Sequence, residues 1–181
     1  MSITIPTLLA DRIEPILSQP PAVTQAPMAK DGMAEQVAAF CWRLHKGRIQ
    51  VLLVTSRDTG RWVLPKGWQM TGKPAQTAAA REAWQEAGVE GQVQALSIGQ
   101  YCYDKIRPDA APLRCCVSIF ALRVRRLKAD FPEHKERHRK WFSPGEAAGV
   151  VAEGDLSALL ARLQEAPEAL TGVPKTALPK V

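Results

Sequence analysis

The sequence predicts an α/β protein in which a mixed β-sheet carries helices. Short apolar runs typical of strands lie on both sides of one alanine-rich helical stretch, and more helix follows the last run. Of the 181 residues, 46% are hydrophobic and 23% are charged, which is typical of a globular protein with one well-filled core. Disorder of the whole chain is therefore not expected.

The two ends of the chain are expected to lie outside this domain. Five prolines interrupt residues 1–32 and three interrupt residues 166–181, so neither end can form a long helix. We predict an N-terminal arm over 1–32, one domain over 33–165 and a C-terminal tail over 166–181. Charged residues break up the apolar ones near the N-terminus, so we expect no signal peptide, no membrane span and no membrane partner.

The domain is predicted to begin with a β-hairpin. Residues 35–43 are largely apolar, Lys46-Gly47 supplies a turn, and residues 49–54 are again apolar and β-branched. Residues 61–65 predict a third short extended piece, which ends at Pro65 and is followed by a loop.

A helix is predicted between Pro74 and Gly88. Proline suits the first turn of a helix because its missing N–H has no partner there, and glycine suits the left-handed residue that closes a helix. Residues 89–103 and 113–124 then predict two more strands, and residues 144–150 and 154–164 predict two helices.

Glu82 and Glu86 are four residues apart, so they share one face of the predicted helix. Paired carboxylates at the edge of a cleft can hold Mg²⁺, which prefers oxygen ligands and keeps several waters or substrate phosphates. A lone pair of this kind is more often an exposed polar face. The surrounding residues therefore decide between the two interpretations.

Those surroundings resemble the Nudix box, whose pattern is G-x5-E-x7-R-E-U-x-E-E-x-G-U, where U is apolar. The matching residues are Gly67, Arg81, Glu82, Ala83, Glu86, Gly88 and Val89. Two positions depart from the pattern, because Lys73 replaces the first glutamate and Gln85 replaces the first residue of the E-E pair. Over residues 34–160 the chain also resembles the diphosphoinositol polyphosphate phosphohydrolase branch, through residues 38–43, 52–57 with Arg61-Trp62, and 139–142.

The resemblance implies a Nudix α/β/α sandwich and a Mg²⁺-dependent hydrolase, with Mn²⁺ as the alternative ion. It implies that Glu82 and Glu86 hold the metal, and we count Gly67 with them as a metal-site residue. In that branch the position of Gln85 carries the proton acceptor. A glutamine amide cannot accept a proton at neutral pH, so either activity is reduced or another group acts as base.

Four residues of the basic segment 123–140 could replace that base, because many Nudix enzymes keep a further ligand or base on a loop here. They are Glu133, His134, Glu136 and His138. Spacing does not choose among them, and we expect the segment to be an exposed loop. Arg81 has two open roles: it binds the substrate diphosphate, or it pairs with the carboxylates and orients them.

The positive charge of the chain suits a small polyanionic substrate. Lys and Arg number 24 and Asp and Glu 18, so 24 − 18 gives +6, and residues 123–140 alone contribute 8 − 3 = +5. Arginine matches phosphate oxygens with a planar set of donors. The predicted phosphate-binding residues are Arg43, Arg57, Lys66, Arg107 and Arg139.

Three functions remain open at this point. The first is hydrolysis of a phosphoanhydride bond, for example in a diphosphoinositol polyphosphate or a dinucleoside polyphosphate. The second is binding of a polyphosphate or nucleotide without cleavage, because the expected base position holds Gln85, which cannot accept a proton. The third is nucleic-acid binding through residues 123–140, which we do not expect because that segment has few aromatic residues for stacking on bases.

The four cysteines show no paired C-x-x-C spacing of a zinc site, and three lie in apolar stretches, where a thiol behaves as a small hydrophobic group. This pattern favours a reducing compartment. We therefore expect a cytoplasmic protein.

Overall fold

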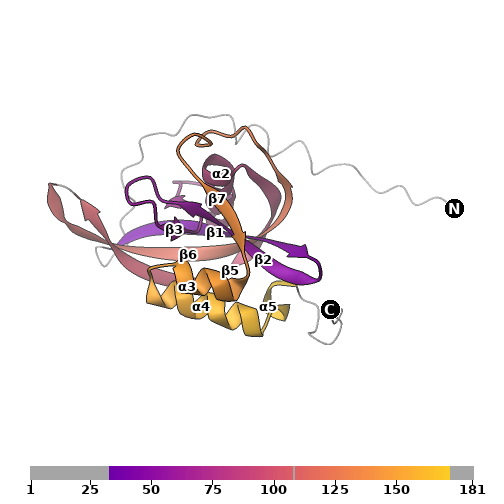
Figure 1. Ribbon diagram of the computed structural model, residues 1–181. Coiled ribbons are helices and arrows are strands. Elements are labelled where there is room, and N and C mark those ends of the chain that lie inside the picture. The colour runs from indigo at the N-terminus through magenta and orange to yellow at the C-terminus, as the bar shows by residue number, and fades with distance from the viewer. Residues whose placement is uncertain (1–32, 108, 172–181) are drawn as a thin grey trace.

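The computed structural model describes residues 33–107 and 109–171, apart from the side chain of Thr171 (Figure 1). The strands are β1 (Ala34–His45), β2 (Arg48–Thr55), β3 (Trp62–Val63), β4 (Lys66–Trp68), β5 (Val89–Arg107), β6 (Ala110–Leu127) and β7 (Arg139–Phe142). The helices are α2 (Ala75–Ala87), α3 (Pro144–Val150), α4 (Gly154–Glu165) and α5 (Glu168–Thr171).

The described strands form one mixed sheet in the order β3-β2-β1-β6-β5. β1 and β6 are parallel and the other strand pairs are antiparallel. The outer edge of β1 is shared by two partners, because its first part pairs with β4 and its last part pairs with β2. Between them the N–H of Ala39 donates to the carbonyl of Pro65 at 2.9 Å, which fixes the position where the chain enters β4.

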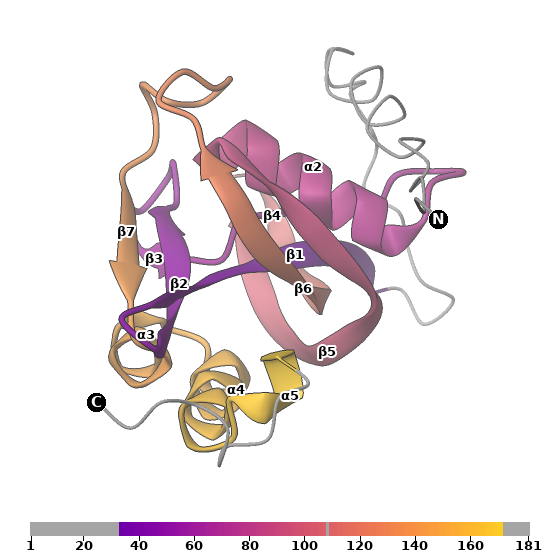
Figure 2. The same cartoon turned by 90° about the vertical axis from the view of Figure 1, so that its right-hand side faces the viewer.

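Helices cover both faces of the sheet, and the expected α/β/α sandwich is confirmed (Figure 2). Because alternate residues of a strand point to opposite faces, Val37, Ala39 and Cys41 pack under α2. Phe40 and Trp42 pack on the other face, which α3, α4 and α5 cover. Four leucines of α4 complete that second core layer.

The hairpin, the central helix, the two long strands and helices α3 and α4 are confirmed close to their predicted bounds. Three short elements differ from the prediction. β4 lies where a loop was expected, and β7 was not predicted as a strand, since runs of three or four residues show too little alternation. The third is α5, which lies in the predicted tail, yet its Leu170 is only 2% exposed and packs in the core.

Gly88 ends α2 in the left-handed conformation that the sequence predicts. Its φ is 62°, and its N–H donates to the carbonyl of Trp84 at 2.9 Å. A Cβ at this position would lie 2.8 Å from the ring of Phe131 and 2.9 Å from the carbonyl of Lys128. Glycine is therefore required by backbone conformation and by the close approach of the segment after β6.

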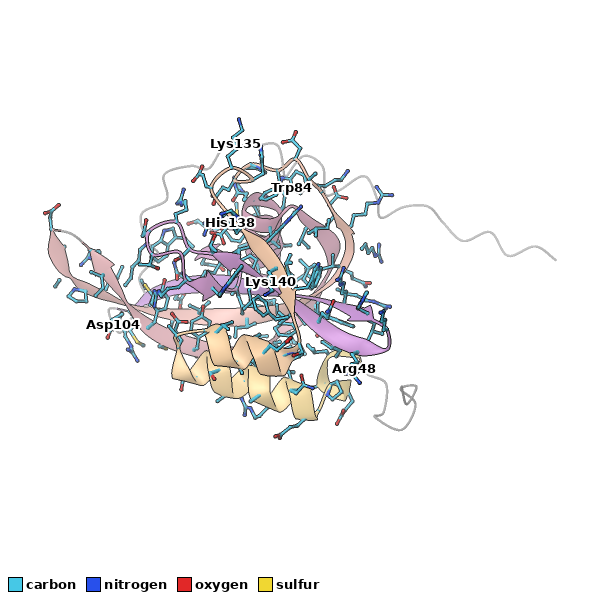
Figure 3. All side chains as sticks on the ribbon, viewed as in Figure 1. Arg48, Trp84, Asp104, Lys135, His138 and Lys140 are labelled. Carbon is cyan, nitrogen blue, oxygen red and sulfur yellow. A yellow bond between two sulfur atoms is a disulfide. The ribbon has the colours of Figure 1, made fainter. Side chains whose placement is uncertain are left out.

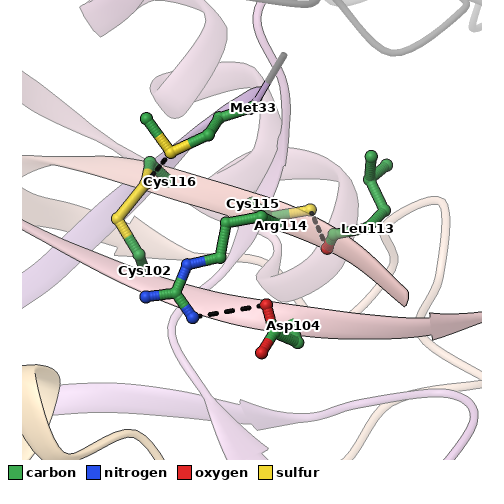
Figure 4. The surroundings of a disulfide bond; sticks show 7 residues. All are labelled: Met33, Cys102, Asp104, Leu113, Arg114, Cys115 and Cys116. Atoms are coloured by element: carbon green, nitrogen blue, oxygen red, sulfur yellow. Dashed lines mark hydrogen bonds and ion pairs between the residues drawn. A yellow bond between two sulfur atoms is a disulfide. The ribbon is translucent and has the colours of Figure 1, made fainter. Parts of the chain in front are cut away.

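Two of the cysteines are joined, contrary to the expectation of free thiols. Cys102 of β5 and Cys116 of β6 are opposite each other in the sheet and form a disulfide (Figure 4). Cys41 and Cys115 are buried free thiols, in agreement with the prediction. A cytoplasmic location remains a prediction. Among the described helices, none has the length and apolar composition needed to span a membrane.

Candidate metal and phosphate site

The carboxylate of Glu82 rests directly against Gly67. A Cβ built on Gly67 would lie 2.3 Å from Cδ of Glu82, a distance that no side chain tolerates. The reason is local geometry: β4 pairs with β1, α2 packs on the same face of the sheet, and Gly67 is the strand residue that faces the helix. Gly67 thus provides the space in which the carboxylate lies, consistent with its position in the motif.

Glu86 lies one turn further along α2 and is 6% exposed. Its Oε2 accepts a hydrogen bond from the backbone N–H of Lys66 at 3.1 Å, and its Oε1 accepts one from the guanidinium of Arg137. Burial, together with the charge of Glu133, raises the pKa of Glu82 to about 7, and burial raises that of Glu86 to about 7 against the lowering effect of Arg137. A cation placed between them would favour their ionised forms.

Residues 128–138, between β6 and β7, pack over this site. The N–H of Glu133 donates to the carbonyl of Gln85 at 3.1 Å, and the N–H of Lys128 donates to that of Gly88 at 2.9 Å. At the other end the N–H of Thr55 donates to the carbonyl of His138 at 2.9 Å. Figure 3 shows Lys135 and His138 on the outer side of this segment. The segment was expected to be an exposed loop, which is wrong for Glu133 and Arg137, whose side chains face inward.

Arg137 lies at the site but was not among the residues predicted from the sequence. Its side chain is 6% exposed and contacts Glu86; its Nε donates to Oε2 of Glu133 at 2.7 Å and its Nη1 to the carbonyl of Thr55 at 2.9 Å. The only signal in the sequence was the spacing of Glu133 and Arg137, four residues apart, which is compatible with an ion pair. That spacing does not predict that the pair is buried beside Glu86.

The family of the chain follows from comparison with known proteins. Residues 34–162 match the family model of the NUDIX domain. The chain belongs to the Nudix family. The predicted resemblance is therefore confirmed.

The Nudix relatives include a curated protein named Nudix hydrolase 16, mitochondrial, from Arabidopsis thaliana, which is 35% identical over 105 residues, 55% of this chain and 56% of that protein. They also include diphosphoinositol polyphosphate phosphohydrolase 3-alpha from Mus musculus, 28% identical over 123 residues, 67% of this chain and 71% of that protein. The match spans little more than half the length of the first relatives, 56% and 53%.

Solved structures show the same fold. An Ap4A hydrolase from C. elegans superimposes with a TM-score of 0.57 at 19% identity, covering 77% of this chain and 98% of that one. The dihydroneopterin triphosphate pyrophosphohydrolase of E. coli superimposes with a TM-score of 0.56 at 17% identity, covering 72% and 94%. At these identities the likeness concerns the fold alone.

The residues that depart from the Nudix box lie in different surroundings. Gln85 is half-buried on α2 beside Glu86, and its carbonyl accepts the bond from Glu133. Lys73 is exposed in the turn before α2, where its carbonyl accepts a hydrogen bond from the Gln69 amide at 3.0 Å. The departure at Gln85 thus lies on the helix that carries the two carboxylates, whereas the one at Lys73 lies on the exposed turn before it.

Of the four alternative bases, Glu133 is the one brought to the other carboxylates, as its effect on the pKa values of Glu82 and Glu86 indicates. His134 instead contacts the carbonyl of Phe131 at 2.7 Å, and Glu136 contacts Arg57 at 3.5 Å. His138 is exposed. Arg81 is buried, and its charge lowers the pKa of Glu82, which favours its orienting role.

Two of the five predicted phosphate-binding residues adjoin the carboxylates. Arg57 lies 4.0 Å from Glu133, and Lys66 contacts Glu86 through its backbone. The amine of Lys66 donates to the Tyr103 hydroxyl at 2.8 Å, and burial lowers its pKa. The other three have different partners: Arg43 contacts Gln50 and the Trp141 ring, Arg107 the Ala111 carbonyl, and Arg139 the Ala87 carbonyl.

The donors present fit a hard divalent ion. Among the described residues no group of three or more His, Cys, Asp or Glu side chains gathers as metal ligands, so a zinc-type cage is not formed there. Two buried carboxylates at a strand–helix junction suit Mg²⁺, which binds through one or two carboxylates together with water and phosphate oxygens. The contact with Gly67 brings the Glu82 carboxylate directly against the backbone of β4.

Proposed function

We propose that this chain is a Mg²⁺-dependent hydrolase that cleaves a phosphoanhydride bond in a small polyphosphorylated substrate. The observation that carries the proposal is the pair of carboxylates on one face of α2, the partly buried Glu82 against Gly67 and the buried Glu86 against the N–H of Lys66. Family membership supports a hydrolase of a phosphate-containing compound. The finer assignment rests on the chemistry of these residues.

In this proposal Glu82 and Glu86 hold the ion, which when bound neutralises phosphate charge and lowers the pKa of a bound water. Arg81 orients Glu82. Arg57 supplies positive charge at the rim, where its exposed guanidinium can meet phosphate oxygens. Attack of water on phosphorus then cleaves the P–O bond of the anhydride and releases two phosphate-bearing products.

Glu133 is proposed as the base that accepts the proton of the attacking water. It is the acidic residue of segment 128–138 whose charge raises the pKa of both Glu82 and Glu86. Its backbone N–H also donates a hydrogen bond to Gln85, and in the branch that the chain resembles the base stands at the position of Gln85. A carboxylate can accept a proton that an amide cannot. Loss of a general base typically lowers the rate by about 10²–10⁴.

Diphosphoinositol polyphosphates and dinucleoside polyphosphates are the proposed substrate class. Relatives are named for the first class, and a structure of the same fold is named for Ap4A. Both compounds are strongly anionic, which suits a chain with a formal charge of +6. We accordingly propose that the binding partner is a small anionic substrate and that the protein is located in the cytoplasm.

The test is an assay of phosphate or nucleotide release from diphosphoinositol polyphosphates, diadenosine polyphosphates and nucleotide sugars, with Mg²⁺ or Mn²⁺ present. We expect turnover of at least one substrate, abolished by Glu86→Gln and lowered about 10²–10⁴-fold by Glu133→Gln. His138→Gln, on the exposed side of the same segment, is the matched control and should keep the rate. No turnover by the natural chain or by Gln85→Glu would contradict the proposal.

The second candidate is a polyphosphate-binding domain that does not cleave its ligand, favoured by Gln85 at the expected base position. Calorimetry separates the two functions. Binding of a polyphosphate that remains intact for hours, with no gain of turnover in Gln85→Glu, supports the binding domain. Rapid disappearance of the ligand excludes it.

A further inference from the structure

The guanidinium of Arg137 lies at the centre of the carboxylate cluster and joins three separate parts of the fold. It contacts Glu86 on α2, Glu133 on its own segment at 2.7 Å and the carbonyl of Thr55 at the end of β2 at 2.9 Å. Only 6% of the Arg137 side chain and 8% of the Glu86 side chain are exposed. A buried carboxylate and a buried guanidinium thus neutralise each other.

Both carboxylate oxygens of Glu86 are already engaged. Oε2 accepts from the N–H of Lys66 and Oε1 from Arg137. The first donor is a backbone group fixed by the pairing of β4 with β1, whereas the second is a side chain on a segment without regular structure. The guanidinium is the more easily displaced donor, and a cation arriving at Oε1 of Glu86 meets the positive charge of Arg137 there rather than the neutral N–H of Lys66.

We propose that Arg137 is an internal counter-ion that competes with the divalent metal for Glu86, so that metal binding releases Arg137 from this carboxylate. The inference rests on the metal site of the proposed function. Two cations cannot share one buried carboxylate oxygen without strong mutual repulsion. Glu133 keeps a cationic neighbour when Arg137 leaves, because Arg57 lies 4.0 Å from its Oε1.

Release places a guanidinium beside the ion, where its planar donors match the oxygens of a bound diphosphate. Arg137 is then a positioning residue that exchanges a carboxylate partner for a phosphate partner. The backbone of segment 128–138 stays joined to β2 meanwhile, because the N–H of Thr55 donates to the His138 carbonyl and the N–H of His138 donates to the Thr55 hydroxyl, each at 2.9 Å.

Competition is measurable as metal affinity, independently of turnover. Calorimetric titration with Mn²⁺ and with Mg²⁺ at pH 8 compares the natural chain with Arg137→Gln. We expect the metal dissociation constant to fall in Arg137→Gln, and taking the coupling typical of two linked binding events as the scale, the fall is about 5–150-fold. A mere structural role for Arg137 predicts equal or weaker metal binding.

Arg57→Gln is the matched control, because it removes the same charge from a residue that contacts Glu133 but not Glu86. It should change metal affinity much less than Arg137→Gln. Equal gains in the two variants would show a general effect of charge and would overturn direct competition. Absence of metal binding in all three proteins would overturn both this inference and the proposed function, whereas equal, measurable binding overturns the inference alone.

A second measurement is made on the natural chain, and a conservative variant serves only to assign the signal. Nitrogen-15 NMR of arginine side chains reports rotation of each guanidinium, and the Arg137 signal is assigned by its absence in Arg137→Lys. We expect restricted rotation of this guanidinium without metal and its loss on addition of Mg²⁺. Rotation that stays restricted at saturating Mg²⁺ would show that the contact with Glu86 persists, which contradicts release.

Discussion

The contact between Gly67 and Glu82 shows how one missing side chain defines the site. The carboxylate occupies the volume that any Cβ at position 67 would fill, and the glycine φ is not in the left-handed region. The requirement for glycine is therefore the close approach of the carboxylate, whereas at Gly88 the backbone conformation matters as well. The same residue type is needed at the two ends of the motif for different reasons.

Replacement of Gly67 by alanine should displace Glu82 and weaken metal binding. The expected loss is about 10–100-fold in affinity, the range found when the support of a metal ligand is removed. Calorimetric titration with Mn²⁺ measures it. Gly149→Ala, in α3 with open space around the new Cβ, is the control and should bind metal as the natural chain does. Unchanged affinity in Gly67→Ala would show that Glu82 is not a ligand.

The buried carboxylates also predict how stability depends on pH in the absence of metal. The pKa of Glu82 is raised from 4.5 to about 7 on folding, so between these values the folded protein binds more protons than the unfolded one. The contribution of Glu82 to the free energy of unfolding should thus be largest below about pH 4.5. It should decrease as the pH rises to about 7, by a loss on the order of 3 kcal/mol.

Urea unfolding in EDTA across this pH range measures the effect. Glu82→Gln should reduce the slope and leave the part due to Glu86, whose pKa is also raised to about 7 and which titrates jointly with Glu82. Saturating Mg²⁺ should also flatten it, because the bound ion keeps the carboxylates ionised. A stability that rises with pH over this range in the natural chain would contradict the burial of these groups.

At the scale of elements, the junctions at the two ends of α2 position the chemistry. β4 holds Gly67 and Lys66 in register with β1, and the left-handed Gly88 turns the chain into β5 beneath Lys128 and Phe131. The helix thereby meets the segment 128–138 that carries Glu133 and Arg137. The site depends on where β4, α2 and segment 128–138 meet, and the last of these lies outside the motif.

Alanine at Gly88 should destabilise the fold by more than its backbone conformation explains. An L-residue in the left-handed region costs about 1–2 kcal/mol, and the new Cβ would also meet Phe131 and the Lys128 carbonyl. Gly72→Ala is the matched control, because its φ of 71° is similar but its surroundings are open. Chemical denaturation of both variants should show the larger loss for Gly88→Ala. Equal losses of unfolding free energy in the two variants would mean that Phe131 and the Lys128 carbonyl move away from the new Cβ at no cost.

At the scale of the whole molecule, a single sheet separates the α2 layer, which carries the carboxylates, from the layer of α3, α4 and α5 (Figure 2). The long β5–β6 hairpin extends beyond this body in Figure 1, and the disulfide between Cys102 and Cys116 joins its strands. This bond crosslinks the hairpin independently of the carboxylate cluster.

Reduction of the disulfide should lower the free energy of unfolding by about 3 kcal/mol, the loop-closure estimate for cysteines 14 residues apart. Guanidinium unfolding with and without reductant measures this change. The double variant Cys102→Ala/Cys116→Ala should be as stable as the reduced chain and indifferent to reductant. An unaltered transition in the reduced natural chain would show that strand pairing alone fixes the hairpin.

The parts of the fold that were predicted from sequence are those with local causes. Helix α2 has a periodic alanine-rich face, a proline before it and a glycine after it, and the β1–β2 hairpin has apolar runs around Lys46-Gly47. The shorter β4 and β7 depend on pairing with distant strands, which no local pattern reveals. The disulfide likewise follows from the register of two strands rather than from cysteine spacing.

The sequence by itself determined the family, the central helix and the two carboxylates on one of its faces, because a helical period and flanking glycines are written in adjacent residues. Only the tertiary structure decided that Glu133 joins those carboxylates and that Arg137 neutralises Glu86. It also decided that Arg57 and Lys66, rather than Arg43, Arg107 or Arg139, adjoin the site. These outcomes depend on how a segment without regular structure packs across α2 and β2, which is set by long-range contacts rather than by local periodicity.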